Sequence, residues 1–163
     1  MRPIEHEEVE EAAMQMEKGT APGPNGFMVY FFQFFWDLVK EEVWEIVEES
    51  RKSKRILKAF NATFLTLIPK EQGASAPDKF RPICLCNVIL KIITKVIANR
   101  LKSLLHLLIS SEQTGFVEGC QILDGIILAH EMIHSLKQTK SSGMLLKVDL
   151  AKAYDKVDWK YME

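Results

Sequence analysis

Apolar residues recur about every 3.6 positions in two stretches of the first third of the chain. Residues 5–18 and 28–50 each place apolar side chains on one side and glutamates on the other, which predicts two amphipathic helices. We interpret the aromatic side of the second helix as core rather than as a stacking platform for bases. The seven residues 20–26 contain two prolines and two glycines, which predicts a loop between the helices.

Two short β-type runs and two further helical stretches follow. Residues 63–68 and 80–85 are rich in β-branched and apolar side chains, and a polar, glycine-containing segment joins them, which predicts a β-hairpin. Asn87 is placed to cap a long helix over 88–108, and residues 122–137 predict another helix. We expect the buried stripe of the long helix to comprise Ile89, Ile93, Val96, Leu101, Leu104 and Leu108.

Charge is distributed unevenly along the 163 residues, although the formal total is only -1. Residues 1–50 hold 3 Lys or Arg against 12 Asp or Glu, a net charge of -9. Residues 51–110 hold 12 against 2, a net charge of +10, and residues 111–163 hold 6 against 8. The basic middle segment therefore calls for an anionic partner or for an internal acidic one.

Composition places the chain among soluble globular proteins, with 47% hydrophobic and 26% charged residues. Three cysteines at 84, 86 and 120 favour free thiols in a reducing compartment over a disulfide or zinc framework. The acidic start of the chain has no apolar segment of the secretory type. The longest apolar stretch, 27–36, is about half the length of a membrane span. We expect a soluble intracellular chain without membrane contact.

The end of the chain places carboxylates where a metal could be held. Residues 110–120 read as a glycine-punctuated loop, 144–150 as a buried strand, and helical patterning resumes at 151. Asp149 lies near the end of that strand, and a strand tip is a rigid position for a metal-binding carboxylate. The local pattern alone favours the interpretation that Asp149 caps the next helix and that Asp155 and Asp158 are ordinary solvated charges.

Six sequence blocks, in order, resemble the reverse transcriptase domain of non-LTR (LINE-type) retrotransposons, especially those of plants. They are Ala-Pro-Gly-Pro-Asn-Gly-Phe at 21–27, Leu-Ile-Pro-Lys at 67–70, Phe-Arg-Pro-Ile-Cys-Leu-Cys-Asn at 80–87, Lys-Ile-Ile-Thr-Lys-Val-Ile-Ala-Asn-Arg-Leu-Lys at 91–102, Gln-Thr-Gly-Phe-Val-Glu-Gly at 113–119 and Lys-Val-Asp-Leu-Ala-Lys-Ala-Tyr-Asp-Lys-Val-Asp-Trp at 147–159. The resemblance covers nearly the whole chain, and six blocks in the family's order are a specific signal.

The resemblance implies a role for five residues of this chain. Asp149 matches the first-motif aspartate that binds both catalytic Mg²⁺ ions, and the backbone carbonyl of Leu150 would be a further ligand. Tyr154 matches the aromatic residue that excludes a 2′-hydroxyl; otherwise it would be a core aromatic. Lys70 and Arg81 match the basic residues of the fingers hairpin that hold the triphosphate of the incoming nucleotide. Without the resemblance, both would be ordinary solubilising surface charges.

The same family implies partners and also an incomplete site. An RNA template, a DNA primer, deoxynucleoside triphosphates and a nuclear location follow from the resemblance alone. Asn25 stands where the family usually has aspartate, Cys120 where it has a basic residue, and Gly125 where it has asparagine. The paired aspartates that complete the metal site lie beyond the last block found here, so we expect a fragment that is inactive by itself.

A competing motif lies in the helix predicted over 122–137. His130, Glu131 and His134 form a His-Glu-x-x-His sequence, in which two histidines one turn apart bind zinc and the glutamate acts as base. The extended zinc-protease pattern needs glycine at 137 and histidine at 140, where Lys137 and Lys140 stand. The motif therefore predicts a zinc peptidase only as a weak alternative.

The sequence thus predicts an α+β fold, mostly helical, that corresponds to a partial and truncated right-hand polymerase with the fingers hairpin and the first palm strand. We expect an N-terminal helical region over 1–58 and a partial reverse transcriptase region over 59–163. The function implied is a nucleotidyltransferase fragment, an RNA-directed DNA polymerase. The alternative of another class is a non-catalytic remnant that binds nucleic acid through its basic segment.

Overall fold

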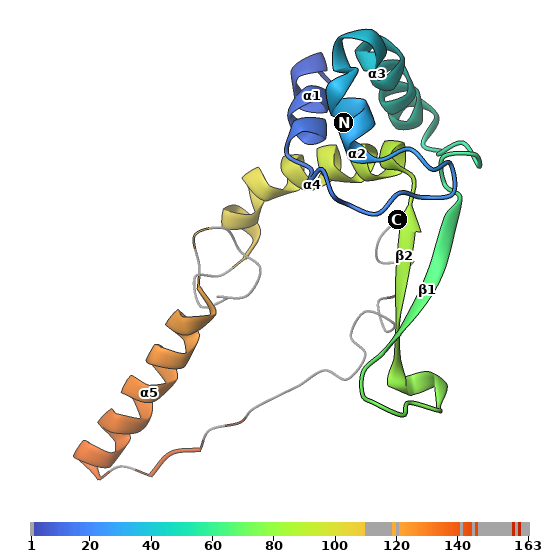
Figure 1. Cartoon of the computed structure of the whole chain (residues 1–163). Helices are drawn as coiled ribbons and strands as arrows, with labels where there is room; N and C mark the ends of the chain where they lie inside the picture. The colour runs from blue at the N-terminus through green and yellow to red at the C-terminus, as the bar shows by residue number, and fades with distance from the viewer. Residues whose placement is uncertain are drawn as a thin grey trace. The chain divides into compact units, whose positions relative to one another are not determined.

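The computed structural model describes residues 2–109, 119, 121–140, 142–144, 146, 158 and 160. The chain divides into two compact units, Met1–Ser110 and Ser111–Glu163, each of which is described by itself. Helices and one small antiparallel sheet make up the elements (Figure 1), so the predicted α+β, mostly helical class is confirmed. None of the helices in the described ranges is long and apolar enough to cross a membrane.

Four helices form the body of the first unit: α1 (His6–Met14), α2 (Val29–Phe34), α3 (Trp36–Ser53) and α4 (Val88–Leu108). The loop predicted over 20–26 is confirmed, since no helix or strand lies there. The single helix predicted over 28–50 is divided at Phe35, whose φ of -100° and ψ of 24° leave the helical region. The division falls within a run of aromatic residues, which lose side-chain freedom in a helix and favour it weakly.

The first helix is shorter than predicted, because it ends at Met14 rather than at residue 18. The side-chain amide of Gln33 donates to the carbonyl oxygens of Ala13 at 2.9 Å and Met16 at 3.0 Å. The last carbonyls of a helix have no partner within it, and a side chain from elsewhere can supply one. This contact also ties α2 to the end of α1.

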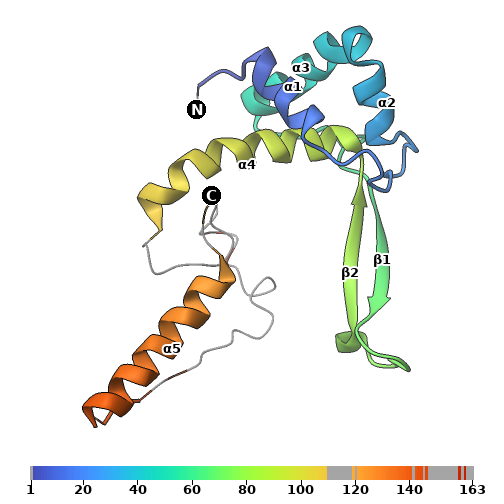
Figure 2. The ribbon, with the colours of Figure 1, turned by 60° about the vertical axis from the view of Figure 1, so that its left-hand side comes forward.

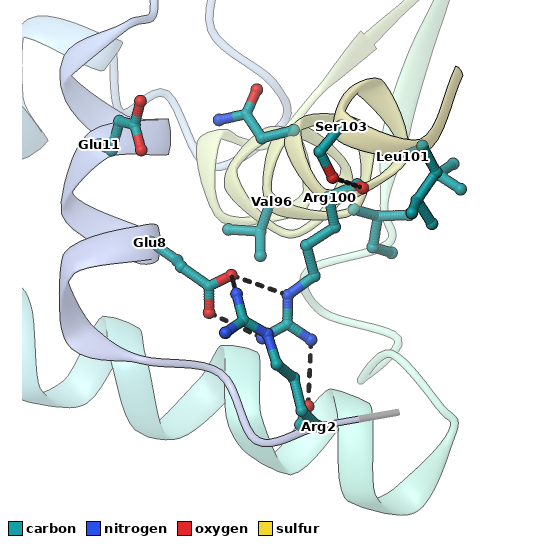
Figure 3. A pocket seen from close by; sticks show the side chains of 10 residues that line it. Arg2, Glu8, Glu11, Val96, Arg100, Leu101 and Ser103 are labelled. Carbon is teal, nitrogen blue, oxygen red and sulfur yellow. Dashed lines mark hydrogen bonds and ion pairs between the residues drawn. The ribbon is translucent and has the colours of Figure 1, made fainter. Parts of the chain in front are cut away.

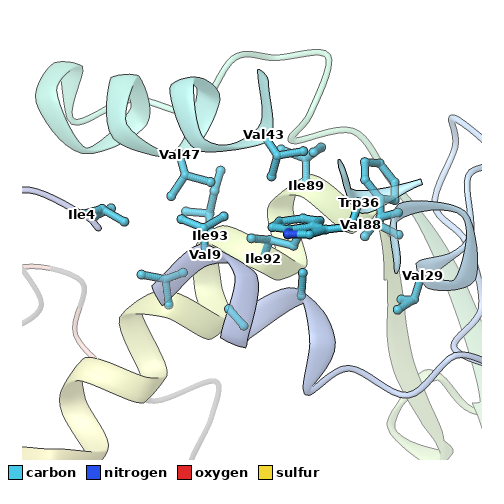
Figure 4. Close-up of a cluster of buried hydrophobic side chains, with 14 residues drawn as sticks. Ile4, Val9, Val29, Trp36, Val43, Val47, Val88, Ile89, Ile92 and Ile93 are labelled. Atoms are coloured by element: carbon cyan, nitrogen blue, oxygen red, sulfur yellow. The ribbon is translucent and has the colours of Figure 1, made fainter. Parts of the chain in front are cut away.

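One hydrophobic core joins the four helices (Figure 4). Phe32, Trp36 and Val43 are buried as the period of the second predicted helix requires, and α4 contributes the largest group of buried side chains. Figure 4 shows the core side chains converging between α1, α3 and the first half of α4. The buried residues of α4 are Val88, Ile89, Ile92, Ile93 and Val96.

The second half of α4 is not buried, which contradicts the predicted stripe through residue 108. Leu101, Leu104 and Leu108 expose between 47% and 72% of their surface in the structure. The helical period was correct, but within the first unit the core residues of α1, α2 and α3 pack only on α4 up to Val96. Amphipathic patterning identifies an apolar side of a helix, whereas burial also requires a neighbour that covers it.

The predicted hairpin is confirmed. Strand β1 (Thr63–Pro69) pairs antiparallel with β2 (Phe80–Cys86), from Thr63 opposite Cys86 to Pro69 opposite Phe80. A short 3-10 helix η1 (Pro77–Lys79) precedes β2. Figure 2 shows the hairpin extending away from the helices of the first unit, with β2 leading directly into α4. Both faces of β1 are exposed along its whole length.

The second unit contains α5 (Ile122–Thr139), which confirms the helix predicted over 122–137. Lys140 follows it with a left-handed φ of 51°, which ends the helix. Of the strand predicted over 144–150, Met144 and Leu146 are described and have no regular secondary structure; the remainder lies outside the described residues, as does the loop over 110–120 except for Gly119. The region boundary predicted at residue 58 stays a prediction.

Candidate functional site

Three cationic side chains lie at the turn end of the hairpin: Lys70 directly after β1, Lys79 at the end of η1 and Arg81 in β2. Arg81 lies opposite Ile68, and the backbone N–H of Lys70 donates to the carbonyl of Lys79 at 2.8 Å, which extends the same register by one pair. Residues opposite each other share a face, and residues two apart in a strand share it as well. Lys70, which continues β1 by one residue, and Arg81 therefore lie on one face, on a diagonal of the ladder. Lys79 ends the 3-10 helix η1, where this alternation does not apply.

The three cations differ in how far their charge is neutralised. The Lys79 ammonium forms an ion pair with the Glu71 carboxylate. The Lys70 ammonium donates to the backbone carbonyl of Asp78 at 2.7 Å, a contact that orients the side chain without cancelling its charge. Within the described part of the chain, no acceptor or carboxylate contacts the Arg81 guanidinium. The exposed Lys70 and Arg81 thus leave two positive charges open to an anion at the hairpin end.

Asn87 fixes the base of the hairpin where β2 passes into α4. It occupies the predicted cap position, but its side chain does not cap the helix, so the capping role is wrong. The buried side chain instead accepts from the N–H of Asn25 at 3.1 Å and donates to the carbonyls of Ala59 at 3.0 Å and Phe60 at 3.3 Å. One amide therefore joins the 20–26 loop, the entry to β1 and the exit from β2.

The 20–26 loop is held against the same junction by two further features. A Cβ atom on Gly23 would lie 2.4 Å from the backbone nitrogen of Asn87, so only glycine permits this approach. The Lys91 ammonium donates to the carbonyl of Ala21 at 2.7 Å. Sequence analysis missed this junction; the one signal for it was that both segments belong to blocks of the same resemblance.

Two arginines of the basic segment are neutralised by acidic residues of the first fifty. Arg51 makes a two-pronged contact with Glu48 at 2.8 and 2.6 Å, and Glu48 also accepts from the backbone N–H of Ile4 at 3.1 Å. Arg100 on α4 likewise contacts Glu8 on α1 at 2.9 and 2.7 Å (Figure 3). The arginine hydrogen bonds lower the pKa of both Glu8 and Glu48 to about 2, against an opposing effect of burial.

These contacts answer part of the question posed by the charge distribution. The acidic first fifty residues are an internal partner for part of the basic segment, since Glu48 pairs with Arg51 and Glu8 pairs with Arg100. Among the described residues, no ion pair joins the acidic first fifty residues to the hairpin, where Lys79 pairs with Glu71 of the hairpin itself. The cations open to an external anion are therefore found on the hairpin face rather than at these two arginines.

The histidines of the zinc alternative lie on α5. His130, Glu131 and His134 are exposed, and a ring nitrogen of His134 lies 3.4 Å from the side-chain nitrogen of Gln138. Among the described residues, no group of three or more His, Cys, Asp or Glu side chains is arranged to hold a metal ion. Asp149, Leu150 and Tyr154, which the resemblance assigns to the metal and the sugar, lie outside the described residues.

Comparison with known proteins decides the family. Residues 68–162 match a family described as reverse transcriptase (RNA-dependent DNA polymerase). The chain belongs to the reverse transcriptase family. The match begins at the end of β1 and includes Lys70, Arg81 and Asp149.

Three relatives of this chain come from transposable elements. It is 32% identical over 160 residues to the transposon TX1 uncharacterized 149 kDa protein of Xenopus laevis, covering 98% of this chain and 12% of that protein. It is 28% identical over 158 residues to the retrovirus-related Pol polyprotein from type-1 retrotransposable element R2 of Nasonia vitripennis, covering 96% and 14%. The R2 polyprotein of Popillia japonica is 23% identical over 166 residues, with 96% and 21% covered. The chain thus spans no more than about a fifth of these relatives.

Proposed function

We propose that this chain supplies the fingers hairpin and the first palm motif of a LINE-type RNA-directed DNA polymerase, of the plant kind that its sequence blocks resemble. The observation that carries the proposal is the position of Lys70 and Arg81 on one face of the hairpin, with their charges open to an anion. Membership of the reverse transcriptase family supports it. An RNA template, a DNA primer and a nuclear location belong to the same proposal.

The hairpin face binds the triphosphate of the incoming deoxynucleotide. The Lys70 ammonium acts as a compact point charge, whereas the Arg81 guanidinium offers a planar fork that matches two phosphate oxygens. Because Lys79 is paired with Glu71, we assign Lys79 a structural role in the hairpin rather than that of a third phosphate ligand. Asn87 keeps the hairpin fixed on the helical body, so these two charges are presented from a defined position.

Asp149 and Leu150 provide the metal-binding part of the proposal. A carboxylate and a backbone carbonyl are oxygen donors of the kind that Mg²⁺ prefers, and a Mg²⁺ ion held there would stabilise negative charge on the phosphates. Tyr154 would contact the sugar and exclude a 2′-hydroxyl. Because the resemblance assigns only one carboxylate of the metal site to this chain, we expect residues 1–163 alone to show no primer extension with Mg²⁺ and deoxynucleotides.

Titration of the whole chain with a fluorescent deoxynucleoside triphosphate tests the hairpin assignment. We expect K70Q/R81Q to weaken binding about tenfold, because two charge-assisted contacts are lost. The control K54Q/K58Q removes the same number of charges from the basic segment outside the hairpin and should change affinity less than about twofold. Equal weakening by both variants would show that only the total charge matters.

A single-stranded RNA oligonucleotide separates this proposal from the alternative of a non-catalytic remnant. If RNA binds through Lys70 and Arg81 and the triphosphate does not compete, the hairpin holds a nucleic acid backbone instead of a nucleotide. Such binding would weaken steeply between about 50 and 200 mM salt, as counterion release requires.

A further inference from the structure

Five aromatic rings form an uninterrupted array on the surface around α2. The ring centroids of Phe27 and Phe31 lie 4.7 Å apart, and those of Phe31 and Phe35 lie 5.1 Å apart. Phe34 continues the array, with its centroid 4.8 Å from that of Phe35 and 5.7 Å from that of Tyr30. Four of the five are exposed, with Phe34 at 65% and Tyr30 at 53%. Exposed aromatic residues in contact with one another mark an interaction surface more often than isolated ones do.

The array continues onto α3 as a mixed apolar and acidic stripe. Phe35 precedes the first residue of α3, and Leu38, three residues later in the first turn of that helix, is 75% exposed. Glu41, Glu42 and Glu45 follow it three, four and seven residues later, positions on the same side of a helix, and all three are exposed. The single cation in this stretch, Lys40, is paired with Asp37 at 3.4 Å. Phe35, the array member at the start of α3, therefore leads onto a side of this helix that carries three carboxylates, of which that of Glu41 lies 3.8 Å from a ring nitrogen of His6.

This charge decides between two uses of exposed aromatic rings. Surfaces that stack single-stranded bases combine the rings with cations that follow the phosphate backbone. Here the neighbouring charges are carboxylates, which repel phosphates. Lysine and arginine side chains, by contrast, are attracted to aromatic ring faces and to carboxylates alike.

We propose that the aromatic array, Leu38 and Glu41, Glu42 and Glu45 form a docking surface for a cationic amphipathic helix of a partner protein. The apolar side of such a helix packs on Phe34 and Leu38, and its Lys and Arg residues reach the carboxylates and ring faces. Burial of exposed apolar area supplies the affinity, and the charges select a basic partner over an acidic one. The surface lies outside the hairpin and does not depend on the proposed function.

Two designed 18-residue peptides test the proposal against the whole chain by fluorescence anisotropy. They share one apolar pattern and differ only in carrying lysine or glutamate at the polar positions. We expect the lysine peptide to bind and F34S/L38S to weaken it about tenfold, as loss of two central contacts predicts. The control L65S/L67S replaces two similarly exposed apolar residues of the hairpin and should leave binding unchanged.

A charge-reversal variant tests the acidic part without altering the aromatic array. E42K/E45K should weaken the lysine peptide and improve binding of the glutamate peptide. Because Phe34, Leu38 and both glutamates are exposed, these changes should preserve the fold, which thermal unfolding followed by circular dichroism verifies. K70Q/R81Q should leave peptide binding intact, so a failed nucleotide experiment and a failed peptide experiment remain distinct results.

Three results would overturn the proposal. One is equal binding of the lysine peptide by the wild-type chain, F34S/L38S and E42K/E45K. Another is binding of a single-stranded RNA 12-mer that F34S/L38S abolishes, which would make the array a base-stacking platform. The third is that the chain does not bind the peptide but self-associates in sedimentation experiments, and that F34S/L38S abolishes the self-association. A second copy of the chain would then be the occupant of this surface.

Discussion

Replacement of Glu8 by glutamine removes the charge from the contact that ties α1 to α4. Arg100 donates to both carboxylate oxygens of Glu8, and also to the backbone carbonyls of Arg2 at 3.0 Å and Pro3 at 2.6 Å. The Glu8 carboxylate accepts in addition from the backbone N–H of Glu5 at 2.9 Å. E8Q is close in shape, so the experiment isolates the charge rather than the packing.

The pKa of Glu8 sets the size of the expected effect. Hydrogen bonding from Arg100 lowers this pKa from 4.5 to about 2. A shift of this size corresponds to a limit of about 3 kcal/mol of stability. Because solvent still reaches both side chains, at 15% and 19% exposure, screening reduces the expected cost of E8Q to about 1–2 kcal/mol at pH 7.

Urea unfolding followed by tryptophan fluorescence measures this cost, since Trp36 is buried in the core that α1 and α4 share. A carboxylate whose pKa is lowered by folding stabilises the protein fully above pH 4.5 and loses that contribution as the pH falls toward 2. The wild-type chain and E8Q should therefore differ at pH 7 and converge near pH 2. E10Q, in which an exposed glutamate of the same helix is changed, should stay within about 0.5 kcal/mol of wild type.

Two outcomes would refute this reasoning. Equal stability of E8Q and the wild-type chain at pH 7 would mean that the Arg100 contact contributes nothing net. A difference that persists undiminished at pH 2 would mean that glutamine disturbs packing or the Glu5 hydrogen bond, and that the charge is not the cause.

Two further predictions concern the junction and the core. N87A should destabilise the chain by about 2–4 kcal/mol, because it removes a buried amide and leaves three part-buried partners without that hydrogen bond. It should also accelerate hydrogen exchange at the Asn25 amide, and unchanged exchange there would contradict the bridging role. I92A should cost about 2–5 kcal/mol in urea unfolding, whereas L104A should cost less than about 1 kcal/mol because that side chain is half exposed. Similar costs for the two would mean that the second half of α4 is covered.

Elements specified by local sequence were the ones that could be predicted. The hairpin follows from two β-type runs separated by a polar turn, and its strands lie within one residue of the expected ends. The long helix α4 has the predicted bounds, Val88–Leu108. Its burial was predicted only in part, because which turns of an amphipathic helix are covered depends on distant segments rather than on its own period.

Contacts between distant residues lay beyond sequence reasoning. Glu8 and Arg100 are 92 residues apart in sequence, and Asn25 and Asn87 are 62 apart. Nothing in a local pattern distinguishes a glutamate that pairs from one that is solvated, or an asparagine that caps a helix from one that bridges a loop. The shared face of Lys70 and Arg81 became evident only from the register, since slipping by one residue would move a side chain to the other face.

The basic segment uses arginine and lysine differently, and this limits what its net charge can reveal. Arg51 and Arg100 are largely shielded from solvent, with 19% and 15% exposure. Each forms a bidentate contact with a carboxylate, a geometry that a planar guanidinium provides and an ammonium does not. R100K would therefore preserve the charge of +10 over residues 51–110 yet lose the two-pronged contact with Glu8 and most of the carbonyl contacts. The capacity to bind an external anion depends on which cations are not paired with carboxylates of the acidic first fifty residues. Lys70 and Arg81 are two such cations.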